Sequence, residues 1–375
     1  METFAPTLPC VRNVDVLVLP PLSVSERGSG GEVSSKRRTA AHSVIAGALA
    51  LFALHLGFGQ YAERNPKRKD PTYGDKFDKL NARADDRPLV LMLGSSRTLL
   101  GFHAGQLESE HPDLRAFNFG TPASGPITHL VYLRRLLNTG VVPDLLLIEV
   151  LPPALADGPD GPAEQIFLTG ERLSSEEVDL VGRFGFPPSG VRAAWRESVY
   201  NPASALRFQL LGRLLPSWIP WNLRGDWSRN TDAHGWATPP RQTVTAEERY
   251  ERTANADAEY RRTLAGMTAE GRPMLALAEL LDLCRTRGIR ARVLLMPEAP
   301  SFRNLYPDGL AERIGAALRD VAIPRGAGFT DARNWLPEED FYDGHHLFRA
   351  GAEAFTRRLT AEAIRPHFAG AGNSR

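Results

Sequence analysis

Two adjacent serines, Ser95 and Ser96, stand between an apolar run and a helical pattern in the stretch LVLMLGSSRTLLGF, Leu89 to Phe102. The apolar run has the length of a buried strand, and the residues after the serines have helical spacing. A serine at the start of a helix most often caps its backbone amides. A serine there can also attack an electrophile, but it is a weak nucleophile and needs a general base. The stretch therefore predicts either a cap or a nucleophile.

A candidate base lies near the other end of the chain, in the stretch YDGHH, which ends at His346. Asp343 precedes His346 by three residues, so its carboxylate could bond one ring nitrogen and leave the other free to accept a serine proton. Asp343, His345 and His346 could instead form a surface turn, or hold a metal ion. The metal alternative would make the protein a metal-dependent phosphoesterase.

The composition limits the classes of function. The 375 residues carry 45 basic and 44 acidic side chains, so the charge balance gives no indication of nucleic-acid binding. All lysines precede residue 80, which predicts a body without the lysine that pyridoxal phosphate or a phosphate loop requires. The two cysteines, Cys10 and Cys284, are too few for a zinc cluster. No cofactor and no resident metal are expected.

Strands and helices alternate over most of the chain after residue 84. The expected strands are apolar runs at 88–93, 114–120, 143–153 and 289–298. The expected helices have amphipathic patterns at 98–107, 126–140, 272–288, 309–322 and 351–364. This alternation predicts an α/β fold with three layers, α/β/α, around a central parallel sheet. Such sheets bind ligands at the carboxyl ends of their strands, where Ser96 is expected to lie.

The chain before and within this domain divides into further segments. We expect a disordered tail (1–38), a transmembrane or signal-anchor helix (39–61), a linker (62–84), an α/β domain (85–368) with a mostly helical insertion (154–271), and a short tail (369–375). A start of translation near Val33 is left open, because no methionine follows Met1 until Met92.

The apolar run at 39–61 is long enough for one bilayer span. A cleaved signal peptide and a buried core helix are the alternatives. Basic residues flank the run on both sides, so charge leaves the membrane orientation open.

The two candidate stretches resemble motifs of the SGNH (GDSL-like) hydrolase superfamily. LGSSRT is similar to the block that carries the nucleophile after the first strand, which implies Ser96. YDGHHLFRAGAEAF is similar to the Asp-x-x-His block before the last helix, which implies Asp343 and His346 as catalytic partners. FNFGTPASG is similar to the second block, which implies an oxyanion hole from the amides of Ser96 and Gly125, with Gly120 as the second choice. The resemblance implies a flavodoxin-like α/β/α fold.

The third block departs from the family pattern, because LLIEVLPPAL has Glu149 near the position of the asparagine that usually completes the oxyanion hole. A carboxylate there would repel an oxyanion unless it were protonated or turned away. An inactive glycan-binding or assembly protein is therefore the alternative function. Candidate substrate-binding residues are Arg97, Glu149, Glu298 and Arg303. Arg97 could instead be a solvated side chain, and Glu298 and Arg303 could bind one another.

The anchored arrangement resembles the SGNH-like proteins of bacterial exopolysaccharide O-acetylation, such as those of alginate systems. This resemblance implies a serine-dependent hydrolase or acyltransferase that acts on an O-acyl, mainly O-acetyl, ester of a carbohydrate. It also implies a periplasmic or extracellular domain and a membrane-bound O-acyltransferase as a partner. The sequence leaves esterase and transferase open.

Overall fold

The computed structural model describes residues 30–219, 230–239 and 242–369, and the chain divides into two units, Met1–Phe52 and Ala53–Arg375. The described residues of the first unit belong to α1 (Gly30–Glu63), so the helix begins inside the segment predicted as a tail. Most of both predicted tails lies outside the described residues. Arg37–Glu63 is long and apolar enough to cross a membrane, a property that anchors and signal sequences share.

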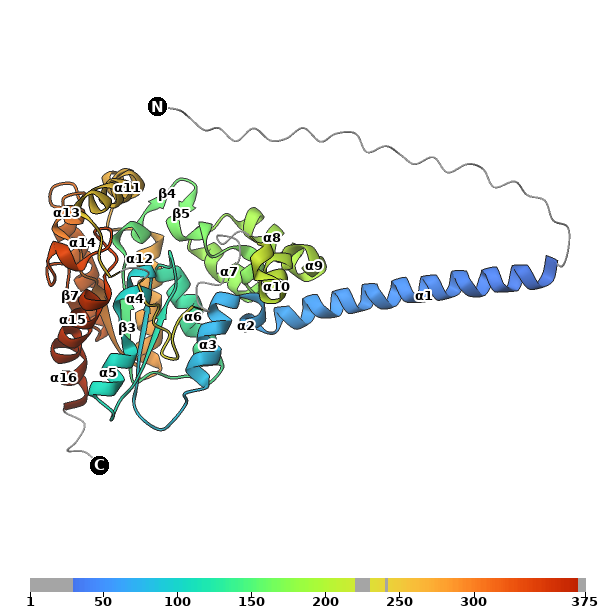
Figure 1. The fold of residues 1–375 in the computed structure, drawn as a ribbon, viewed down its shortest axis with the longest axis horizontal. Coiled ribbons are helices and arrows are strands. Elements are labelled where there is room, and N and C mark those ends of the chain that lie inside the picture. Colours follow the sequence, from blue (N-terminus) through green and yellow to red (C-terminus); the bar gives the residue numbers. More distant parts are fainter. Residues whose placement is uncertain (1–29, 220–229, 240–241, 370–375) are drawn as a thin grey trace. The chain divides into compact units, whose positions relative to one another are not determined.

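A five-stranded parallel sheet forms the centre of the second unit (Figure 1). Its strands, in spatial order, are β2 (Arg115–Gly120), β1 (Leu89–Gly94), β3 (Leu145–Glu149), β6 (Arg290–Leu295) and β7 (Gly328–Asp331). This is the strand order of flavodoxin-like folds, and it confirms the predicted fold class. The sequence did not indicate β7, because this four-residue strand is only partly buried and has no apolar run.

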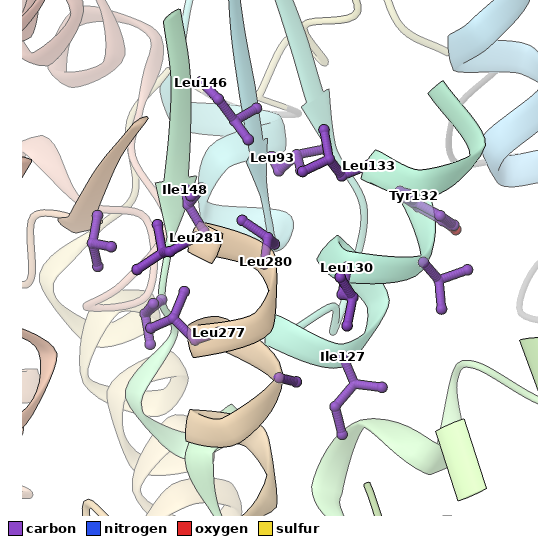
Figure 2. Close-up of a cluster of buried hydrophobic side chains, with 14 of the residues drawn as sticks. Leu93, Ile127, Leu130, Tyr132, Leu133, Leu146, Ile148, Leu277, Leu280 and Leu281 are labelled. Carbon is purple, nitrogen blue, oxygen red and sulfur yellow. The ribbon is translucent and has the colours of Figure 1, made fainter. Parts of the chain in front are cut away.

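Helices cover both faces of the sheet, because its strands are apolar on both sides. On one face lie α6 (Pro126–Asn138), α12 (Arg272–Thr286) and α14 (Leu310–Ala322). Figure 2 shows side chains of α6 and α12 against Leu93 of β1 and Leu146 and Ile148 of β3. The alternate residues Val90 and Met92 point to the other face, where α5 (Ala104–Glu110) and α15 (Arg349–Leu359) pack.

The helix predicted over 98–107 is two helices, α4 (Ser96–Gly101) and α5, with a break at Phe102 and His103. Phe102 is fully buried, and His103 Nδ1 accepts a hydrogen bond from Gln106 N, which caps α5. The local cap therefore divides what the apolar spacing predicts as one element.

The prediction of a linker over 62–84 is wrong. The segment folds into α2 (Pro66–Lys69) and α3 (Pro71–Asn81), and Lys69 and Lys76 are buried. Lys76 Nζ donates 2.9 Å to Asn118 O and also to Gly235 O, and Lys69 pairs with Glu63. The segment resembles a linker in sequence because it is polar, but its lysines are buried and have bonding partners. The body therefore contains lysines, and their position in the sequence does not exclude lysine chemistry.

The insertion is mostly helical, as predicted. Its α-helices are α7 (Ser175–Arg183), α8 (Pro188–Tyr200), α9 (Pro202–Ala205), α10 (Arg207–Leu214) and α11 (Ala246–Ala265). Short 3₁₀ turns occur at Pro152–Leu155, Ala163–Ile166, Gly170–Arg172 and Pro216–Trp218, and β4 (Asp157–Gly158) pairs with β5 (Gly161–Pro162). After β6 the chain adds α13 (Pro300–Arg303), and after α15 a π-helical turn at Thr360–Ile364 and α16 (Arg365–Ala369).

Candidate active site

The two serines that follow β1 have different positions. Ser95 is fully buried and is the N-cap of α4, where its Oγ accepts a hydrogen bond 3.2 Å from Arg97 N. Ser96 is the first residue of α4 and is only partly buried. It lies beyond the carboxyl end of β1, between β2 and β3, at the point where the strand order of such sheets reverses. The cap and the candidate nucleophile are therefore different residues.

Ser96, His346 and Asp343 form a hydrogen-bonded chain, although 250 residues separate the serine from the histidine. Ser96 Oγ lies 2.8 Å from His346 Nε2, and His346 Nδ1 lies 2.8 Å from Asp343 Oδ2. Asp343 Oδ1 accepts a further bond 2.9 Å from His346 N, which fixes the turn. This is the geometry by which a histidine accepts a serine proton while a carboxylate holds its ring.

The Asp343 carboxylate is ionised at neutral pH. Burial by itself would raise its pKa, but the facing His346 ring and the hydrogen bonds from His346 outweigh this effect and hold the pKa well below the usual value. A charged carboxylate stabilises the imidazolium that forms when His346 takes a proton.

His345 lies on the same turn but in an apolar setting. It is buried against the rings of Tyr260 and Phe302, and its Nδ1 lies 3.4 Å from Asp343 Oδ1 without a hydrogen bond. Burial, together with the nearby His346, lowers the pKa of His345 to about 3. His345 is therefore neutral at physiological pH.

This shift predicts an acid-sensitive fold. Below about pH 6.5 the unfolded chain protonates His345 and the folded chain does not, so the free energy of unfolding should fall as the pH falls toward 3. His345→Phe keeps the ring packing and removes the titration. Denaturant unfolding of the full chain in detergent should show a smaller loss between pH 6.5 and 4.5 in the variant than in the wild type. Equal losses would contradict the assignment.

Asp343, His345 and His346 also form a group that could hold a metal ion, because donor atoms of the three lie within 4.8 Å of one another. In the observed arrangement, however, the two ring nitrogens of His346 face Asp343 and Ser96. A metal on His346 Nε2 would take the place of the Ser96 hydroxyl. The same residues can thus serve one chemistry or the other, and the observed distances are those of a serine–histidine pair.

Glu149 lies behind the serine turn and does not bind substrate, which corrects its predicted role. Its fully buried carboxylate accepts hydrogen bonds from Ser95 N (2.7 Å), Ser95 Oγ (2.8 Å), Thr98 N (3.2 Å) and Thr98 Oγ1. These four donors come from residues on either side of Ser96 and hold the carboxylate within the turn. A Cβ at Gly94 would collide with Glu149 Oε2 and Thr98 Oγ1, so glycine is required at the end of β1.

Both predicted glycine amides of the oxyanion hole already have acceptors. Gly125 N donates to Glu164 Oε2 at 3.0 Å, and Gly120 N donates to Asn118 Oδ1 at 2.9 Å. Glu164 also accepts from Ile127 N and Thr128 N, so it caps α6 from within the insertion. Burial raises the pKa of Glu164, although the surrounding donors oppose this. The prediction that Gly125 and Gly120 supply free amides is therefore wrong.

The loop between β2 and α6 contains an amide with no hydrogen-bond acceptor among the described residues, that of Ala123. Ala123 has φ +55°, the left-handed region that is uncommon for a residue with a side chain. Two bonds to Gly94 O, 2.8 Å from Thr121 N and 2.7 Å from Ser124 Oγ, hold the loop beside the serine turn. Ala123 and Ser96 line the same cavity.

The other three predicted substrate-binding residues bind protein groups; Arg97 and Glu298 are buried, and Arg303 is partly buried. Arg97 is 1% exposed; its Nη1 lies 3.1 Å from Glu298 Oε1, and its Nη2 donates to the carbonyls of Met296 and Pro297. Arg303 Nη1 donates to the Glu298 and Arg333 carbonyls. The alternative that Glu298 and Arg303 bind one another is the one observed, and Arg97 is not solvated. These contacts stabilise the loops that follow the carboxyl ends of β6 and β7.

A cavity of about 1100 Å³ opens over Ser96 and His346. The insertion supplies most of its walls: Glu164, Ile166, Phe167 and Arg172 on one part, and Arg252, Asn255, Glu259 and Tyr260 of α11 on another. These wall residues could not be predicted from the sequence, because the insertion has no recognisable motif and lies far from Ser96 along the chain. The helical spacing of 252, 255, 259 and 260 was the one available signal that they share a face.

Comparisons with known proteins give a partial match. Residues 69–170 match a family described as "Protein of unknown function (DUF1574)". No curated protein matches the chain. Among solved structures, the chain is similar at 14% identity to a protein described as a platelet activating factor from Streptococcus pneumonia. The match covers 84% of this chain and 98% of that protein, with a TM-score of 0.34.

Two further solved structures show the same level of similarity. An α/β hydrolase enzyme from the metagenome of Lake Arreo has 12% identity, covers 73% of this chain and 94% of its own, and gives a TM-score of 0.32. A catalytic mutant of an acetylxylan esterase from Geobacillus stearothermophilus has 12% identity, covers 75% and 95%, and gives a TM-score of 0.33.

Proposed function

We propose that this protein is a serine-dependent O-acyl ester hydrolase or acyltransferase of the SGNH type. The observation that carries the proposal is the chain of contacts from Ser96 Oγ through His346 to Asp343, each 2.8 Å long, at the carboxyl edge of a parallel sheet. A half-buried carboxylate, a histidine held by it and a partly exposed serine are the parts that acyl transfer requires.

The reaction proceeds through an acyl-enzyme. Ser96 Oγ attacks the ester carbonyl while His346 Nε2 takes its proton, and the resulting imidazolium is stabilised by Asp343. His346 then gives the proton to the leaving alcohol, and acyl-Ser96 remains. Water, activated by His346, releases the acid; a sugar hydroxyl in place of water makes the enzyme a transferase.

Backbone amides stabilise the oxyanion of this reaction. Ser96 N is the first amide of α4 and has no acceptor within its own helix. Ala123 N is the second donor in place of the glycine amides, since its strained loop is held beside the serine turn. Glu149, bound by four donors of the serine turn, does not repel the oxyanion.

The acyl group is acetyl and the substrate a carbohydrate, by resemblance to the SGNH-like proteins of exopolysaccharide O-acetylation. The same resemblance gives a periplasmic or extracellular body, anchored by the helix that contains Arg37–Glu63, and a membrane-bound O-acyltransferase as partner. The volume of about 1100 Å³ over Ser96 is larger than an acetyl group needs and leaves room for sugar units.

Hydrolysis of 4-nitrophenyl acetate by the full chain in detergent tests the proposal. His346→Ala should lower kcat/KM by on the order of 10³-fold or more, because Ser96 loses its base. His111→Ala, at the far end of α5, is the matched control and should leave the rate unchanged. Activity that survives EDTA argues against the metal-dependent alternative. A folded chain without turnover on any acyl ester would favour the inactive glycan-binding alternative.

A further inference from the structure

Arg252 on α11 is a cavity side chain whose guanidinium has no hydrogen-bonding or ionic partner among the residues that the structure describes. Its Nε is buried and unbonded. By contrast, Arg172, which also lines the cavity, donates to Asp70, and the buried Arg97 pairs with Glu298. A buried donor without an acceptor costs free energy, so an unpaired guanidinium beside a reaction site calls for an explanation.

The position of this guanidinium is fixed relative to the triad. Arg252 lies over the ring of Tyr342, 4.1 Å from the ring centroid. Tyr342 directly precedes Asp343, and its amide donates to His346 O at 2.7 Å, so the ring belongs to the turn that carries the base. Stacking on the ring orients the planar guanidinium and leaves its remaining N–H groups for a ligand.

We propose that Arg252 binds an anionic group of the substrate, a carboxylate, sulfate or phosphate, while the ester lies at Ser96. The assignment rests on the proposed function and adds a substrate class to it. A guanidinium binds such groups through two parallel hydrogen bonds, which gives both affinity and orientation. Arg252 thereby takes the role that the sequence predicted for Arg97, which is paired in the interior.

Glu259, a carboxylate that lines the same cavity, lies apart from Arg252. Glu259 is seven residues further along α11, which corresponds to about 10 Å of helix. Asn255 and Glu259 follow Arg252 on the same face and line the same cavity. Their amide and carboxylate groups can bond the hydroxyl groups of a sugar, so the α11 face combines one anion-binding position with groups suited to sugar hydroxyls.

A pair of acetate esters with and without a negative charge tests the assignment. The probes are 4-carboxyphenyl acetate and its methyl ester, which differ in charge and carry the same acyl group. With the full chain in detergent, Arg252→Gln should lower kcat/KM about 10-fold or more for the carboxylate and less than about 2-fold for the methyl ester. Arg252→Lys should recover part of the loss. Arg261→Gln is the control, because Arg261 lies on the same helix, is exposed and pairs with Asp257.

The possible outcomes distinguish the anion subsite at Arg252 from the proposed ester-cleaving activity. Equal losses on both esters, or no loss on either, overturn the anion subsite and leave the esterase intact. If the wild type hydrolyses neither these two esters nor any other acyl ester, the proposed function fails, and the binding of 4-hydroxybenzoate to Ser96→Ala, measured by NMR, still tests the subsite. Weaker binding of that anion in Ser96→Ala with Arg252→Gln supports it, and unchanged binding overturns it.

Discussion

Replacing Ser96 by alanine should abolish ester turnover while the fold is preserved. Ser96 Oγ lies 2.8 Å from His346 Nε2 and caps no helix, so its loss removes the nucleophile and little else. We expect kcat/KM to fall by on the order of 10⁴-fold or more, as when a triad member is removed from a serine hydrolase. The measurement is the rate of 4-nitrophenyl acetate hydrolysis, with the melting temperature of the same sample recorded beside it.

Ser95→Ala is the matched control for this prediction and should show the opposite pattern. Ser95 Oγ donates to Glu149 Oε1 and accepts from Arg97 N, both in the interior. Its removal should cost about 1–3 kcal/mol of unfolding free energy while the nucleophile is kept. If Ser95→Ala were the inactive variant and Ser96→Ala the active one, the nucleophile would be Ser95.

Replacing Glu149 by alanine should cause a large loss of stability. The carboxylate is fully buried and accepts four hydrogen bonds from Ser95 and Thr98, with Arg97 Nε 3.9 Å away. Its removal leaves these donors unpaired in the core and takes one negative charge from beside Arg97. We expect a loss of about 3 kcal/mol or more in the free energy of unfolding, measured by denaturant titration.

Glu279→Ala is the control for the stability prediction. Glu279 is partly exposed and pairs with Arg134 and Arg183 at the surface, so its removal should cost less than about 1 kcal/mol. A similar small cost for Glu149→Ala would show that Glu149 does not organise the serine turn. Ester turnover in Glu149→Ala should also fall, because the turn that presents Ser96 loses its anchor.

The fold class and the proximity of Ser96, His346 and Asp343 could be predicted because both depend on local patterns. The four predicted strands are short, mainly apolar runs between helical patterns, and their length distinguishes them from buried helices. Ser96 follows such a run directly, and Asp343 and His346 are three residues apart within one turn. A parallel sheet then places both stretches at one edge, which brings the serine and the histidine together across 250 residues.

The surroundings of the triad could not be predicted, because they depend on pairs that are distant in sequence. The amide of Gly125 donates to Glu164, 39 positions away, and the guanidinium of Arg97 is paired with Glu298, 201 positions away. Single-residue properties give no indication of such pairs; a charged residue near a strand end suggests a ligand site whether or not it has a partner. The linker prediction fails for the same reason, since buried Lys76 donates hydrogen bonds to backbone carbonyls of remote segments.

The most direct test of the central claim is labelling of the full chain with a fluorophosphonate probe, with the adduct located by peptide mass spectrometry. We expect an adduct on Ser96 in the wild type and its loss in His346→Ala, because the probe reacts with a serine only when a base activates it. An adduct on another serine, or no adduct on a folded chain whose cavity admits the probe, would contradict the account.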